Sequence, residues 1–112
     1  MSLINSSFYI QDDDTVKCCG NNSYGQLGLG DTTDRKVPKL IPNLENVKQI
    51  SCGYYHTMFL LNDGTVKCCG NNTYGQLGLG DKNNRNIPVL IPNLENVKGL
   101  HDVLNIIVYI LL

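Results

Sequence analysis

Cysteine and histidine are the residue types in this sequence best suited to bind a metal ion, and the chain contains five cysteines and two histidines. Structural zinc sites usually take their cysteines in a Cys-x-x-Cys type spacing. Here four cysteines instead form the adjacent pairs Cys18-Cys19 and Cys68-Cys69. Neighbouring side chains on a β-strand point to opposite faces, so the two members of a pair do not easily share one ion. We therefore predict buried, structural cysteines and no metal site.

Two glycine-rich segments, residues 25–30 and 75–80, have the composition of a phosphate-binding loop. A P-loop ends in Gly-Lys-Ser or Gly-Lys-Thr and leads into a helix whose N-terminus holds the phosphate. Neither segment has this ending, and neither is followed by a helical pattern. Because the glycines recur in both halves of the chain, turns of a repeated unit explain them more simply. We expect no bound cofactor.

His56 is the remaining candidate for catalysis, since histidine is the most frequent general base. No serine or cysteine stands with it in a recognisable nucleophile motif. We therefore predict a structural role for His56 and no enzymatic activity.

The segments that must position these residues are short and rich in β-forming side chains. Residues 57–61 are an apolar run, residues 62–64 are the turn sequence Asn-Asp-Gly, and residues 65–69 are mostly β-forming. This pattern predicts a β-hairpin. Residues 7–19 repeat the pattern and predict a second hairpin.

Two further segments complete the predicted strands. Residues 47–52 form a short apolar strand, and residues 87–91, interrupted by Pro88, suit the edge of a sheet because proline donates no ladder hydrogen bond. No stretch keeps the apolar period of a helix. Four short strands in about 50 residues fit one blade of a β-propeller.

The two halves of the chain are copies of one another. Residues 13–48 align with residues 63–98 over 36 positions without a gap, and 28 of these positions are identical. Self-similarity at a fixed period of this size is typical of propellers, solenoids and other repeat arrays. The strand pattern favours the propeller.

Four motifs give the repeat a family resemblance: residues 50–57, Ile-Ser-Cys-Gly-Tyr-Tyr-His-Thr; residues 63–66, Asp-Gly-Thr-Val; residues 70–72, Gly-Asn-Asn; and residues 75–78, Gly-Gln-Leu-Gly. Together they resemble the repeat of the regulator of chromosome condensation family. That resemblance implies a seven-bladed propeller that binds other proteins. The family includes the exchange factor of the Ran GTPase, domains of HECT ubiquitin ligases, a plant ultraviolet photoreceptor and a bacterial β-lactamase inhibitor protein.

The sequence departs from the family pattern in three ways. The family usually has an aromatic pair where this chain has its paired cysteines, and this chain contains no tryptophan. Residues 101–107 replace the segment that corresponds to residues 51–57, although residues 108–111 are again apolar. Two repeats also fall short of seven. We expect a fragment or a subunit, with residues 103–112 as a core or edge strand.

These observations predict an all-β fold of antiparallel four-stranded propeller blades, with about two blades of an incomplete β-propeller over residues 1–112. The first repeat covers about 1–49 and the second about 50–99. Residues 100–112 form a divergent apolar tail.

Charge and hydropathy limit the partners. The net charge is -1, without a basic patch in the sequence, so we predict no nucleic-acid binding. No stretch reaches the roughly 20 apolar residues of a membrane span, and we expect a cytoplasmic protein, or a nuclear one in a eukaryote.

Residues 32–39 hold six of the eight differences between the copies. Because loops on a rigid scaffold carry function, the charged loop residues are candidates for protein binding: Asp34, Arg35, Lys36, Lys82 and Arg85, with Asp31 and Asp81 beside them.

Three functions remain open. The first is a protein-protein interaction scaffold whose partner the sequence does not name. The second, from the resemblance, is guanine-nucleotide exchange on a small GTPase. The third is a structural module that closes a ring as a homo-oligomer, since three or four chains would supply about six or eight blades.

Overall fold

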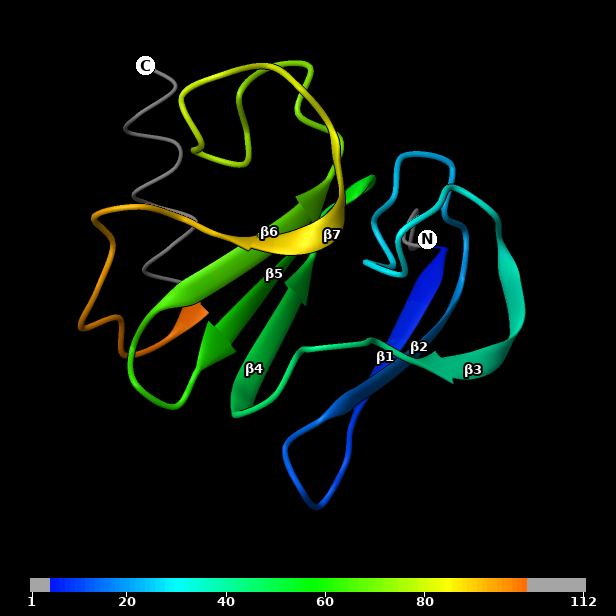
Figure 1. The fold of residues 1–112 in the computed structure, drawn as a ribbon, viewed down its shortest axis with the longest axis horizontal. Coiled ribbons are helices and arrows are strands. Elements are labelled where there is room, and N and C mark those ends of the chain that lie inside the picture. The colour runs from blue at the N-terminus through cyan, green and yellow to red at the C-terminus, as the bar shows by residue number, and fades with distance from the viewer. Residues whose placement is uncertain (1–4, 101–112) are drawn as a thin grey trace.

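The computed structural model describes residues 5–100 and shows two antiparallel β-sheets (Figure 1). Within this part of the chain, no helix has the length and hydropathy needed to span a bilayer. The first sheet has the strand order β1-β2-β3 and the second has the order β4-β5-β6-β7. The strands are β1 (Ser6–Ile10), β2 (Val16–Gly20), β3 (Arg35–Leu40), β4 (Val47–Cys52), β5 (His56–Leu61), β6 (Val66–Gly70) and β7 (Arg85–Leu90).

Both predicted hairpins are confirmed. In the second sheet, β5 and β6 join through a turn in which the Leu61 N–H donates to the Thr65 carbonyl at 2.9 Å. Gly64 has a φ of 84° in this turn, a conformation that costs glycine little. In the first sheet, the corresponding turn holds Asp14 at a φ of 64°. The same hydrogen bond recurs there from Gln11 to Thr15 at 2.8 Å.

β3 and β7 are edge strands, as the proline in each suggests. Among the described strands each pairs with a single neighbour, and each contains a proline that donates no ladder hydrogen bond. β7 begins at Arg85, two residues before the predicted start, because Arg85 pairs with Gly70 across an irregularity in the β6–β7 ladder.

The two sheets stack face to face, with one core between them and a second core beyond. Phe8 of the first sheet contacts Phe59 of the second edge to face, with ring centroids 5.9 Å apart. Alternate residues of β5 and β6 enter different cores, because successive side chains point to opposite faces of a sheet. The core between the sheets contains Val16, Cys18, Leu27, Ile41, Leu44, Val47, Phe59 and Cys69. The core on the far face of the second sheet contains Met58, Leu60, Val66, Cys68, Leu77, Ile91, Val97 and Leu100.

The sheets and the sequence repeats divide the chain at different points. β4 aligns with the end of the first repeat, yet it pairs with β5 and belongs to the second sheet. The first sheet has three strands in the described part of the chain, and a counterpart of β4 is not among them. The predicted strand at 103–112 lies outside the described residues.

Candidate protein-binding surface

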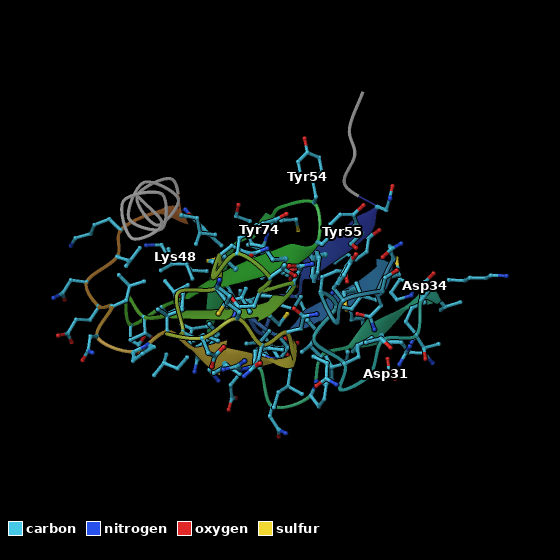
Figure 2. All side chains as sticks on the ribbon, turned by 90° about the horizontal axis from the view of Figure 1, so that it is seen from above. Asp31, Asp34, Lys48, Tyr54, Tyr55 and Tyr74 are labelled. Atoms are coloured by element: carbon cyan, nitrogen blue, oxygen red, sulfur yellow. The ribbon has the colours of Figure 1, made fainter. Side chains whose placement is uncertain are left out.

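Two of the charged residues predicted to bind partners, Asp34 and Lys82, lie on the connections from β2 to β3 and from β6 to β7. The expectation that all five are loop residues was wrong for the other three, because β3 begins with Arg35 and Lys36 and β7 begins with Arg85. Figure 2 shows Asp31 and Asp34 on the connection from β2 to β3, well away from the exposed Tyr54. Lys36 and Lys82 are exposed. Binding by these residues remains a prediction, but the structure shows what several of them already contact.

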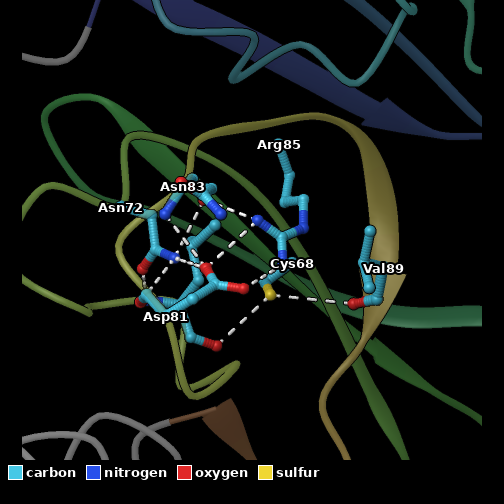
Figure 3. A network of polar contacts seen from close by, with 7 residues as sticks. Cys68, Asn72, Asp81, Asn83, Arg85 and Val89 are labelled. Carbon is cyan, nitrogen blue, oxygen red and sulfur yellow. Dashed lines mark hydrogen bonds and ion pairs between the residues drawn. The ribbon is translucent and has the colours of Figure 1, made fainter.

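Each of these connections is organised around one buried asparagine, and Figure 3 shows the one in the second copy, Asn72. The Asn72 side-chain amide donates to the Asp81 carbonyl at 3.0 Å, to the Asp81 carboxylate at 3.0 Å and to the Asn83 carbonyl at 2.9 Å. Its side-chain oxygen accepts from the Leu77 N–H at 3.0 Å. Asn22 makes the same contacts in the first copy, so both loops are held by the same interior network.

The arginine that begins each following strand pairs with an aspartate of the loop before it. Arg85 and Asp81 form an ion pair at 2.8 Å, and Arg35 and Asp31 form one at 2.7 Å. The hydrogen bond from each arginine lowers the pKa of its aspartate. Asp34 accepts a hydrogen bond from the Asn22 N–H at 2.7 Å. These three predicted residues, Asp34, Arg35 and Arg85, therefore help to fix the shape of these loops.

The predicted burial of the cysteines is confirmed for Cys18, Cys68 and Cys69, whereas Cys19 and Cys52 are partly exposed. Cys68 and Cys69 face different cores, as their adjacent positions on a strand require. Burial raises the pKa of the Cys18 and Cys68 thiols to about 12. A thiol with such a pKa stays protonated and is a poor nucleophile. Among residues 5–100, no group of three His, Cys, Asp or Glu side chains is placed to hold a metal ion.

His56 lies at the start of β5, and burial lowers its pKa. Its ring lies against Gly53, where an added Cβ would collide with it. The Gly53 N–H donates to the His56 carbonyl at 2.8 Å and closes the turn between β4 and β5. The imidazole is therefore neutral at pH 7 and packs against this turn.

Three exposed tyrosines gather at one end of the second sheet, and sequence reasoning missed them (Figure 2). Tyr54 is 62% exposed, Tyr55 is 44% exposed and Tyr74 is 78% exposed. We call these three residues the tyrosine surface. Tyr54 and Tyr55 occupy the turn between β4 and β5, and Tyr74 lies in the glycine-rich loop after β6. They border a shallow groove of about 410 Å³ whose lining is Tyr54, Tyr55, His56, Asn71, Tyr74 and Gln76.

The groove has an uncharged lining, and contacts within the chain position its side chains. The Tyr55 ring packs against that of Tyr24 from the first copy in a tilted arrangement, with ring centroids 4.8 Å apart and an interplanar angle of 56°. Gln76 accepts a hydrogen bond from the Tyr74 N–H at 2.9 Å and donates one to the Asn71 side chain at 3.0 Å. No lysine, arginine, aspartate or glutamate lines the groove. The sequence does carry a signal for this surface. Tyr54 and Tyr55 are consecutive aromatic residues in a turn, so the alternating pattern of a strand does not account for them.

Comparisons with known proteins agree with the repeat. The family model described as the regulator of chromosome condensation (RCC1) repeat matches residues 13–60 and 63–106, and a second model of that description matches residues 47–76. The ultraviolet-B receptor UVR8 of Arabidopsis thaliana is 43% identical over 51 residues, which are 44% of this chain and 12% of that protein. The probable E3 ubiquitin-protein ligase HERC4 of Homo sapiens is 49% identical over 43 residues, which are 37% of this chain and 4% of that protein.

The fold agrees as well. In the crystal structure of Kap60 bound to yeast RCC1 (Prp20), the similar region has a TM-score of 0.75 at 23% identity. It covers 85% of this chain and 25% of that chain. The two sheets therefore correspond to propeller blades, which confirms the predicted all-β fold. The matches span only a small part of each relative's length. Since the repeat model covers most of the sequence in two successive copies, the chain belongs to the regulator of chromosome condensation (RCC1) repeat family.

Proposed function

We infer that this chain is a protein-binding module and that the tyrosine surface is where a partner binds. The carrying observation is the grouping of three exposed tyrosines around an uncharged groove on a rigid β scaffold. Tyrosine is enriched in protein interfaces because it offers a large apolar ring together with a polar hydroxyl. A rigid aromatic side chain also loses little conformational entropy on binding.

The lining chemistry indicates the kind of partner. The groove offers ring faces from the tyrosines and amide groups from Asn71 and Gln76. It offers no cation for a phosphate, because the nearby His56 is neutral at pH 7. This chemistry suits a protein segment that inserts an apolar or aromatic side chain and forms hydrogen bonds at the rim. A nucleic acid or another polyphosphate is not suited to it.

A capture experiment with matched variants tests this function. The tagged chain is compared with a Tyr54→Ala/Tyr74→Ala double variant and with Val37→Ala, whose parent side chain is 64% exposed on β3. Proteins bound from a lysate of the source are quantified by mass spectrometry. We expect at least one protein to be retained by the wild type and Val37→Ala, and reduced about tenfold or more by the double variant. Equal retention by the double variant, or no retention above the resin, contradicts the proposal.

A further inference from the structure

The two amide side chains that line the groove of the tyrosine surface are held in one orientation. The Asn71 Oδ1 atom accepts hydrogen bonds from the Thr73 N–H at 2.8 Å and from the Gln76 side-chain amide at 3.0 Å. The Gln76 Oε1 atom accepts one from the Tyr74 N–H at 2.9 Å. A backbone N–H only donates, so these contacts determine which end of each amide is the oxygen. Both oxygens are therefore turned toward the loop that follows β6.

This orientation makes the groove a donor of hydrogen bonds. Two amides carry two N–H bonds each, and the contacts within the loop use one of these four, the bond from Gln76 to Asn71. Because both side chains line the groove, their remaining N–H bonds are placed to donate to a ligand. The hydroxyls of the exposed tyrosines add donors at the rim. The groove thus combines flat aromatic rings with N–H and O–H groups.

A polyproline II helix of proline residues complements this chemistry. Its side chains are compact apolar rings, and its residues have no backbone N–H that would need an acceptor. The helix makes no internal hydrogen bonds, so its carbonyl oxygens face outward and need donors. The partial positive charge of the N–H groups in the groove matches the partial negative charge of these oxygens. Aromatic-lined grooves in other domains bind proline-rich segments in this way.

Other kinds of segment fit the groove less well. A strand that joins a sheet edge needs donors and acceptors in alternation, whereas the oxygens of Asn71 and Gln76 already accept hydrogen bonds from the loop. β5 and β6 also pair with a strand on both sides. A phosphorylated segment needs a cation, and neither lysine nor arginine lines the groove.

The shallowness of the groove favours a ligand that is ordered before it binds. The volume of about 410 Å³ is near the lower end of the range of about 300–1,000 Å³ for ligand pockets. A small contact area supplies little binding free energy, and ordering a flexible segment would offset much of it. A polyproline II helix is largely preformed, so it loses less conformational entropy on binding.

We propose that this groove binds a proline-rich segment of a partner protein in the polyproline II conformation. Proline rings pack on the three tyrosines, and the amides of Asn71 and Gln76 donate to the carbonyls between those rings. With three residues per turn, prolines at positions i and i+3 contact the groove from the same face of the helix, about 9 Å apart. This inference rests on the proposed function, because it names the class of segment that binds at the tyrosine surface.

Titration of the full, isotope-labelled chain with a capped decaproline peptide tests the inference by amide NMR spectra. We expect saturable shifts of the side-chain N–H signals of Asn71 and Gln76, since these groups donate to the ligand. A capped Gly-Ser peptide of the same length is the control ligand. It has backbone N–H groups and no preformed helix, and we expect it to cause no such shifts.

Asn71→Asp separates donation to the ligand from support of the loop. The variant keeps an oxygen to accept from Thr73 and Gln76 but replaces the donating N–H groups with a second oxygen. Asn21→Asp is the matched control, because Asn21 accepts the same two hydrogen bonds in the first copy, both at 3.0 Å, and does not line the groove. We expect Asn71→Asp to weaken decaproline binding about tenfold or more and Asn21→Asp to leave it unchanged.

Tyr54→Ala decides the question if Asn71→Asp unfolds, since the Tyr54 side chain is exposed and lies outside both cores. We expect it to weaken decaproline binding as well. Absence of shifts with decaproline overturns the inference, as does equal binding of the Gly-Ser peptide or equal binding by the two aspartate variants.

A failure of the proposed function has a different signature. In that case the capture experiment finds no protein whose retention depends on Tyr54 and Tyr74. A partner that is captured through these tyrosines, and that excess decaproline does not displace, would leave the proposed function standing and overturn the proline-rich class of ligand.

Discussion

At the scale of single residues, the loops depend on one amide in each copy. Asn22 and Asn72 each donate three hydrogen bonds and accept one while fully buried. A side-chain amide offers two N–H donors and a carbonyl acceptor at such close spacing. An aspartate there would lose the donors, and an alanine would leave the loop carbonyls without partners.

Asn72→Ala is expected to lower the free energy of unfolding by about 3 kcal/mol, because several buried polar groups lose their partner together. Asn83→Ala is the control, since Asn83 is exposed and takes part in the network through its backbone. Its effect should stay below about 0.5 kcal/mol. Urea denaturation of both variants provides the measurement, and equal effects would show that the buried amide is not what holds the loop.

His56 gives the chain a pH dependence of known sign. Burial lowers its pKa in the folded state below the ordinary value of 6.5, so near that pH the unfolded chain binds more protons. The stability is therefore complete above pH 6.5 and falls as the pH drops toward the folded pKa. We expect denaturation midpoints to decline from about pH 7 to about pH 5, and to decline less in His56→Gln. Parallel slopes for the two proteins would contradict the assignment.

At the scale of elements, the close contacts of β6 determine where it can end. Gly70 has a φ of 109°, and an added Cβ would be too close to the Tyr55 carbonyl and to the His56 Cα. Glycine at this point lets the chain leave the strand beside the turn that carries Tyr55. Its counterpart Gly20 has the same conformation in the first sheet.

Gly70→Ala is expected to destabilise the fold by more than about 2 kcal/mol, because it adds a collision to an unfavourable φ. Gly80→Ala is the control: its φ of 84° is also positive, but no atom of residues 5–100 lies within 4 Å of the added Cβ. That variant should lose only about 1 kcal/mol, the conformational cost alone. Thermal and urea denaturation of the pair separate the two contributions, and similar losses would refute the role of close contact.

The strands were predictable from the sequence where a turn motif fixes them. The hairpin around Asn62-Asp63-Gly64 was predicted within one residue, because the turn sets the register on both sides. The start of β7 was not predicted, because Arg85 is held in register by the ion pair to Asp81 and by pairing with Gly70. The place of β4 in the second sheet was also hidden, since a short apolar strand does not reveal which neighbour it pairs with.

At the scale of the whole molecule, the tyrosine surface is a product of both sheets. Tyr24 from the first copy packs against Tyr55 from the second, so the contact between the sheets also orients the surface. The sequence identified the repeat but not this surface. Exposure in a turn depends on which segments pack beside it, and strand periodicity carries no information about that.

The availability of the charged candidate residues also depends on which side chains pack beside them. Arg35 and Arg85 looked available because sequence alone does not show that each has an aspartate four residues earlier within reach. Lys36 and Lys82 are exposed and remain candidates for the rim of an interface. Their contribution stays a prediction.

Photo-crosslinking from position 54 shows whether a partner binds at the tyrosine surface. A photoreactive phenylalanine analogue replaces Tyr54 in one protein and Val37 in another, since these side chains are 62% and 64% exposed. After irradiation in a lysate of the source, we expect a crosslinked partner from position 54 and none from position 37. Crosslinks from position 37 alone, or equal crosslinks from both, would contradict partner binding at this surface.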